Sequence, residues 1–346
     1  MENIKIWLKK NLFSNWYYSL ITIFILYVLF STIPTFLDWA FFKATFIGNT
    51  KSDCKSGGAC WVFIKVWFDK LIYGFYPEKD LWRVNLTFLI LIFSVALAFF
   101  VKDKFKMYIL FFIIFIFPFI GFILIRGGFG LDQVETRVWG GLALTFMLTF
   151  FGIIFAFPLG VLLALGRRSE LPVFRYFCIA FIEFWRGIPL ITVIFAAAIM
   201  FPLFIPANAN VDKLLRVAIG ISIFESAYIA EVVRGGLQSL PKGQYEAAKS
   251  LGMGYWKMNF LIILPQAIKN ILPALGNQFV YVLKMSSLVS IIGIADLTRK
   301  ANELVVSTYR PLEIYTFLIL EYLNLILIVP FFVRKLERKL KKDSNN

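Results

Sequence analysis

The sequence predicts an all-α polytopic membrane protein of about eight transmembrane helices, with both termini in the cytoplasm. Of the 346 residues, 60% are hydrophobic and 40 are phenylalanine, far more than in a soluble domain. Several apolar runs exceed the roughly 18 to 20 residues with which a helix crosses a hydrocarbon core. A membrane β-barrel would instead show short segments of alternating polarity. A helical membrane protein is therefore expected.

Eight spans are expected, and the inside segments between them are basic, whereas the outside segments are mixed in charge. The first apolar run is too long for a signal peptide, and no small-residue cleavage site follows it. With the N-terminus inside, every inside segment has a basic excess, as the positive-inside rule requires. The rule also accounts for the net charge of +15 without nucleic-acid binding. The spans cover residues 17–37, 83–101, 107–125, 138–165, 176–205, 213–233, 263–284 and 313–332.

The segment from Asp38 to Trp82 is expected outside, and it contains two cysteines. Cys54 and Cys60 flank a turn of small residues, in a compartment where disulfides persist. A disulfide between them is one interpretation, and two free thiols are the other. Cys178 lies alone in the fifth span, where a cysteine usually packs as a small apolar residue.

Composition divides the chain near residue 130. The early spans are rich in Phe and Ile, whereas the later ones carry Gly, Pro and ionisable residues. The chain has no histidine, so it lacks the usual zinc ligand and the usual proton shuttle. We expect an extension with three helices and an outside loop over 1–130, the functional domain over 131–340, and a polar tail over 341–346.

The inside segment 238–265 is the most informative part of the chain. Pro241 and Gly252 predict the two ends of a short surface helix. A second, amphipathic helix should follow it along the membrane surface and lead into the next span. Glu246 is expected near the start of the first helix, where the dipole favours an acid. Such a helix suits docking into a groove of a soluble partner, and an ordinary interfacial linker is the alternative.

The spacing within this segment resembles a family signature. Glu246-Ala247-Ala248, three residues, Gly252, nine residues and Ile262-x-Leu264-Pro265 resemble the EAA motif of ABC importer permeases. The resemblance extends to the polar-amino-acid permeases of that family and runs from about residue 131 to the tail. The front part resembles the M subunit of general L-amino-acid permeases. The stretches similar to the polar-amino-acid permeases are 166–175, 181–195, 227–248, 264–278 and 286–293. Those similar to the M subunit are 58–61 and 72–84.

The resemblance implies an amino-acid import permease in the bacterial inner membrane that is not itself an enzyme. It also implies that the last five helices, within 131–340, form the core of an ABC type I importer permease domain. Its implied partners are ABC ATPase subunits, which bind ATP and Mg, a second permease subunit, a periplasmic amino-acid-binding protein and membrane lipid. No cofactor or metal is expected on this chain, and no catalytic residue. In such permeases the EAA loop is the coupling helix that seats in the ATPase. The ATPase-coupling residues would be Gly243, Tyr245, Glu246, Ala247, Ala248, Gly252, Leu264 and Pro265.

One departure concerns substrate choice. These permeases usually carry an acidic residue after the lysine of a K-D-T-S-L-V run, whereas Met285 follows Lys284 here. Glu225 stands where small residues are common in the family. We expect these departures either to shift substrate choice or to leave Lys284 paired with another carboxylate.

Ionisable residues in or beside the spans require partners or water. Glu183 with Arg186 and Glu231 with Arg234 stand at i,i+3. Each pair therefore shares a helix face, and its two charges can neutralise each other. They either fix helix ends near the cytoplasm or form part of a gate. A helix break is expected at Arg186–Pro189. The candidates for the translocation pathway or gate are Glu183, Arg186, Gly187, Pro189, Glu231, Arg234, Lys284 and Ser287.

Two other classes of protein were weighed. The sequence has no G-x4-G-K-[ST] phosphate loop, which agrees with an ATPase on a separate subunit. A self-sufficient, ion-coupled amino-acid transporter would need inverted repeats and a midplane carboxylate, for which Glu225 is the candidate. An intramembrane enzyme would need a cluster of polar ligands at a membrane face, and the sequence shows none.

Overall fold

The protein is helical and multi-pass. The computed structural model describes residues 2–101, 103–204, 206 and 211–344. Over these residues there are isolated β-bridges but no strand. Six described helices are long and apolar enough to cross a membrane, and one bent helix pair would make a seventh span. The all-α membrane fold is thus confirmed, while the count of eight and the side of each terminus stay predictions.

The chain packs as two compact units. The first comprises Met1–Phe68 with Arg310–Phe317, and the second Asp69–Tyr309 with Leu318–Asn346. The predicted boundary near residue 130 falls inside the second unit and stays a prediction.

The first unit contains an apolar helix that is not packed into a hydrophobic core. It holds α1 (Glu2–Asn11), α2 (Trp16–Leu37), the turns η1 (Asp38–Phe42) and η2 (Lys51–Asp53), and the beginnings of α3 (Val62–Tyr73) and α15 (Pro311–Ser344). None of the residues of α2 is buried, so its side chains require lipid or another protein around them.

An ordered loop follows α2. Cys54 and Cys60 form a disulfide with a Cα–Cα distance of 5.6 Å. Of the two interpretations above, the structure therefore has the disulfide and not the two free thiols. The Cys60 amide donates to Glu313 Oε1 at 3.3 Å. The loop is therefore tied both to itself and to the start of α15.

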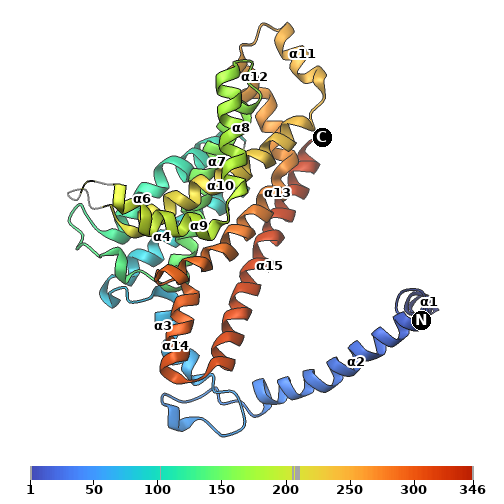
Figure 1. The fold of residues 1–346 in the computed structure, drawn as a ribbon, viewed down its shortest axis with the longest axis vertical. Helices are drawn as coiled ribbons and strands as arrows, with labels where there is room; N and C mark the ends of the chain where they lie inside the picture. The colour runs from blue at the N-terminus through green and yellow to red at the C-terminus, as the bar shows by residue number, and fades with distance from the viewer. Residues whose placement is uncertain (1, 102, 205, 207–210, 345–346) are drawn as a thin grey trace. The chain divides into compact units, whose positions relative to one another are not determined.

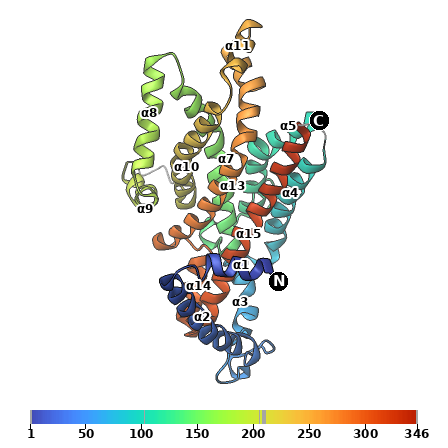
Figure 2. The ribbon, with the colours of Figure 1, turned by 90° about the vertical axis from the view of Figure 1, so that its right-hand side faces the viewer.

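The second unit contains the other helices. Within it, Figure 1 shows α11 at one end and α14 at the other, and Figure 2 shows the same separation after a quarter turn. The C-terminal end of α15 points toward the α11 end in both views. The elements are η3 (Glu78–Asp80), α4 (Leu81–Phe100), α5 (Asp103–Phe111), η4 (Phe112–Ile116), α6 (Phe117–Arg126), η5 (Thr136–Val138), α7 (Gly141–Arg167), α8 (Pro172–Gly187), α9 (Leu190–Phe195), η6 (Ala196–Met200), η7 (Phe201–Phe204), α10 (Lys213–Gln238), α11 (Lys242–Ser250), α12 (Tyr255–Met258), η8 (Asn259–Ile263), α13 (Leu264–Met285), η9 (Ser286–Ile292) and α14 (Leu297–Thr308).

The core of this unit is built around α7 and α10. A Cβ on Gly160 of α7 would come within 2.7 Å of Ile229 Cγ2 and 2.9 Å of the Ser226 carbonyl oxygen. Only glycine permits so close an approach, which is how helices commonly pack in membranes. Two apolar clusters lie along α7, and the second includes Ala248 and Met258 of the inside segment. The inside segment is therefore packed onto the core.

Two expected spans differ from the structure. Residues 176–205 do not form one straight span, because α8 and Leu190–Phe204 meet at a bend of 99°. Ile188 and Pro189 are extended at the break, since a proline forces the preceding residue out of helical geometry. The break is where the sequence predicts it. The other span, α10, is not among the six apolar helices, because ionisable residues interrupt its hydrophobic sequence.

Candidate coupling segment and ion cluster

The ends of α11 are defined by its sequence. Pro241 precedes the first helical residue, and the helix ends at Ser250. Gly252 has a φ of +69°. Its amide donates to the Lys249 carbonyl at 2.9 Å, and the Met253 amide donates to the Ala248 carbonyl at 3.2 Å. This is a Schellman termination, which favours glycine because the left-handed conformation is strained for other residues.

One face of α11 is packed and the other is open. Ala248 is 1% exposed within the apolar cluster, whereas Gly243, Glu246 and Ala247 are exposed. The expected place of Glu246 is wrong, because it is the fifth residue of α11 and the first turn carries no acid. Its carboxylate is therefore on the open face in the second turn, where the helix dipole is weaker.

The inside segment is tied to the core at two tyrosines. The Tyr245 hydroxyl donates to the Leu237 carbonyl at 3.1 Å, and Arg168 Nη1 donates to the Tyr245 hydroxyl oxygen at 2.8 Å. The Arg168 guanidinium also lies 5.0 Å from the centre of the Tyr245 ring. Tyr255 donates to the Leu165 carbonyl at 3.3 Å. The last turns of α7 and α10 thus hold both ends of the loop.

The second expected surface helix is not separate. Residues Tyr255–Ile292 form one continuous helical stretch, in which α12 passes through the π-helical turn η8 into α13. Leu264 is 3% exposed inside the apolar cluster, so its side chain supports the loop from within. Pro265 is exposed beside it.

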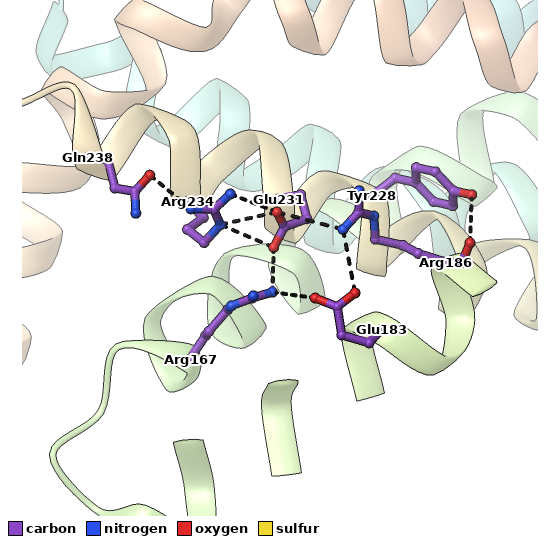
Figure 3. Close-up of polar contacts among 7 residues, drawn as sticks. All are labelled: Arg167, Glu183, Arg186, Tyr228, Glu231, Arg234 and Gln238. Atoms are coloured by element: carbon purple, nitrogen blue, oxygen red, sulfur yellow. Dashed lines mark hydrogen bonds and ion pairs between the residues drawn. The ribbon is translucent and has the colours of Figure 1, made fainter. Parts of the chain in front are cut away.

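A cluster of ion pairs joins α7, α8 and α10, with Glu231 at its centre (Figure 3). Arg234 Nη2 lies 2.9 Å from Glu231 Oε2, and Arg167 Nη1 lies 2.7 Å from Glu231 Oε1. Arg186 Nη1 is 3.7 Å from Glu231 Oε2. Three guanidinium groups therefore surround one carboxylate, which is only 16% exposed.

The second carboxylate of the cluster, Glu183, is shared. Arg167 lies 3.1 Å from Glu183 Oε1, and Arg186 lies 4.0 Å from Glu183 Oε2. The expected i,i+3 pair within α8 is thus the weaker of the two contacts, because Arg167 reaches Glu183 from α7. Arg234 also donates to Gln238 Oε1 at 2.8 Å. The three arginines and two glutamates sum to one excess positive charge.

The remaining pathway candidates lie apart from these ion pairs. Gly187 ends α8 and Pro189 follows at the break, and nothing lies within 4 Å of a Cβ built on Gly187. Lys284 is exposed, and Ser287 donates to the Lys284 carbonyl at 2.7 Å. Among the described residues, no hydrogen bond or ion pair joins Lys284 or Ser287 to the ion cluster.

Glu225 is fully buried with one partner. Its side chain is 0% exposed, and Gln278 Nε2 donates to its Oε2 at 2.6 Å. Its Oε1 has no hydrogen-bond partner among the described residues. Glu225 is the carboxylate considered for ion coupling, and Gln278 of α13 supplies its amide partner.

Sequence reasoning missed Arg167 and Arg168 as site residues. It treated them only as inside charges that orient the chain. Two consecutive arginines at the end of a long helix, beside acids on the neighbouring spans, could have signalled them. The part of the chain that the structure describes contains no group of three or more acidic or cysteine side chains that could hold a metal.

Known proteins share this chain's architecture and sequence. The family described as binding-protein-dependent transport system inner membrane component matches residues 156–342. The inner membrane amino-acid ABC transporter permease protein YhdY of Escherichia coli (strain K12) is 50% identical over 294 residues, which are 84% of this chain and 80% of that protein.

Two further similarities support the same family. The glutamate/glutamine/aspartate/asparagine transport system permease protein BztC of Rhodobacter capsulatus is 30% identical, with 97% of this chain and 94% of that protein covered. A crystal structure of an amino acid ABC transporter with histidines matches with a TM-score of 0.52 at 37% identity, covering 57% of this chain and 92% of that chain. The chain therefore belongs to the family of binding-protein-dependent transport system inner membrane components.

Proposed function

We propose that this chain is the permease subunit of an ABC importer that brings polar or general L-amino acids across the bacterial inner membrane. The 50% identity to an amino-acid ABC permease over 84% of the chain carries this proposal. The geometry of the inside segment supports it, because α11 is anchored by Ala248 and Tyr245 and keeps Glu246 free for a partner.

The proposed assembly contains several other proteins. ABC ATPase subunits bind ATP and Mg and dock on α11, while this chain supplies no catalytic group. A second permease subunit completes the pore, and a periplasmic binding protein delivers the amino acid. The apolar, unburied α2 supports contact with membrane lipid.

The proposed mechanism is alternating access. Closure of the ATPase dimer moves α11, and the movement reaches the helices that carry the ion cluster. Glu231 connects three helices through its arginines, so relative movement of these helices must exchange its partners. This supports a gate at the cluster, with the break at Gly187–Pro189 as its hinge.

Ion-coupled transport by this chain alone has less support. The similar proteins are ABC permeases, and Glu225, its one carboxylate candidate, already has an amide partner in Gln278.

Uptake by the reconstituted complex tests the proposal. Vesicles containing the purified complex and external binding protein should take up an equimolar mixture of radiolabelled L-amino acids only when ATP is inside. Vesicles loaded with a non-hydrolysable ATP analogue are the control. Uptake that proceeds without ATP and follows an ion gradient would contradict the proposal and favour the secondary transporter.

A further inference from the structure

We infer that Arg168 is a positioning residue in energy coupling, which together with Arg167 links α11 to the ion cluster around Glu231. The inference rests on the proposed function, because it concerns how movement of α11 reaches the pore. It assigns a role to two adjacent residues at the end of α7 that act on different parts of the protein.

Arg168 fixes the position of α11 relative to two helix ends. Its Nη1 contacts the Tyr245 hydroxyl at 2.8 Å and the Leu237 carbonyl at 3.5 Å. The Tyr245 hydroxyl donates to the same carbonyl at 3.1 Å. Because Leu237 lies in the last turn of α10, this carbonyl has no partner further along the helix. Two donors, Arg168 from the end of α7 and Tyr245 from α11, therefore meet at one acceptor on α10.

Arg167 contacts the ion cluster from the preceding position. Arg167 is the last residue of α7 and Arg168 is its C-cap, outside helical geometry, so the two side chains diverge to different partners. Arg167 lies 2.7 Å from Glu231 on α10 and 3.1 Å from Glu183 on α8. Figure 3 shows Arg167 between these two carboxylates. A shift of the α7 end therefore changes both the contact with α11 and the cluster.

The end of α7 that carries the two arginines is held in place by buried neighbours. Leu163, Ala164 and Leu165 are buried in the apolar cluster just before the arginine pair. The Leu165 carbonyl also accepts from Tyr255 on the far side of the coupling loop. When α11 moves, the end of α7 must move with it or these contacts must break. Only the short connection 168–171 separates α7 from α8, so α8 receives the same displacement.

A purely structural role would give a different result. If Arg168 only stabilised helix ends through their dipoles, its loss would lower the amount of assembled complex without changing transport per ATP. A role in coupling predicts a lower number of amino acids imported per ATP hydrolysed in complexes that do assemble.

The test measures this ratio in vesicles containing the whole complex. Arg168→Ala and Tyr245→Phe are compared with the wild type, using the mixture of radiolabelled L-amino acids and the release of phosphate. We expect both variants to hydrolyse ATP, with a ratio lowered by about fivefold. The effects of the two substitutions should be less than additive in the double variant, because the two side chains contact each other and share one acceptor.

Controls separate the possible causes. Arg175→Ala removes an exposed arginine in the first turn of α8, whose guanidinium lies over the Tyr176 ring, and it should keep the wild-type ratio. If Arg168→Ala does not assemble, Tyr245→Phe decides, because it removes only a hydroxyl. An unchanged ratio in the variants that assemble overturns the inference. ATP-independent uptake by the wild type would instead overturn the proposed function.

Discussion

At the scale of single residues, Gly252 has open space beside it but a backbone conformation that is strained for other residues. Nothing lies within 4 Å of a Cβ built on it, and its φ is +69°. A side chain would therefore fit sterically, but the left-handed conformation costs an ordinary residue about 1 to 2 kcal/mol. The glycine is needed to end α11, and its replacement should act on the geometry of the loop alone.

We expect Gly252→Val to weaken docking of the ATPase. The β-branched side chain disfavours the left-handed turn, so the end of α11 and the direction of its open face should change. Gly252→Asn is the matched control, since asparagine tolerates this conformation. The amount of ATPase that co-purifies with the membrane-inserted variant is the measurement. Equal recovery with both variants would contradict a docking role for the α11 geometry.

The sequence predicted the ends of α11, but not the partners of Arg167 and Arg168. The ends of α11 follow from Pro241 and Gly252, because each has a local backbone preference that tertiary packing does not override. The partners of Arg167 and Arg168 depend on which helices pass the end of α7. Periodicity along a single helix contains no such information, so local i,i+3 pairing was the only contact available to sequence reasoning.

At the scale of elements, α14 begins with a buried acidic cap, Asp296. Asp296 lies between the spans Tyr255–Ile292 and Pro311–Arg338. Its carboxylate accepts from the Arg299 amide at 2.9 Å and from the Thr298 amide at 3.3 Å. Despite these contacts, burial raises the pKa of Asp296 to about 7. The start of α14 therefore carries a carboxyl group that binds a proton more tightly in the folded protein.

This cap should make stability fall as pH rises. Between pH 3.8 and about 7 the folded state retains a proton that the unfolded state releases, so the free energy of unfolding decreases with pH across this window. Asp296→Asn keeps the cap but does not titrate. We expect the wild type to lose more thermal stability in detergent between pH 5 and 8 than the variant does. Parallel losses would show that Asp296 does not contribute.

The elements themselves were predicted where proline or continuous hydrophobicity marks them. The break after α8 follows from Pro189. In contrast, the helix that begins at Tyr255 continues into its span through a π-helical turn, η8. No residue type signals such a turn. The place of Glu246 in α11 was missed because helix starts vary by one or two residues.

At the scale of the whole molecule, the orientation in the membrane can be tested with three cysteines. We expect a membrane-impermeant maleimide to label intact cells only after a reductant has opened the Cys54–Cys60 disulfide. Cys178 is buried and should stay unlabelled. The double variant Cys54→Ser with Cys60→Ser is the control and should give no signal. Labelling without reductant would exclude the disulfide, and no labelling after reduction would reverse the orientation.

The bend between α8 and α9 has a consequence for how the chain enters the membrane during synthesis. With 16 residues, α8 is about 24 Å long, which is less than the hydrocarbon thickness of about 30 Å. In the ion cluster, Arg186 gains its contact with Glu231 only when α10 has been translated, whereas Glu183 can already meet Arg167 and Arg186. We therefore expect α8 to reach its final place in the membrane only after α10 has been made, so that this part of the chain integrates as a group of helices.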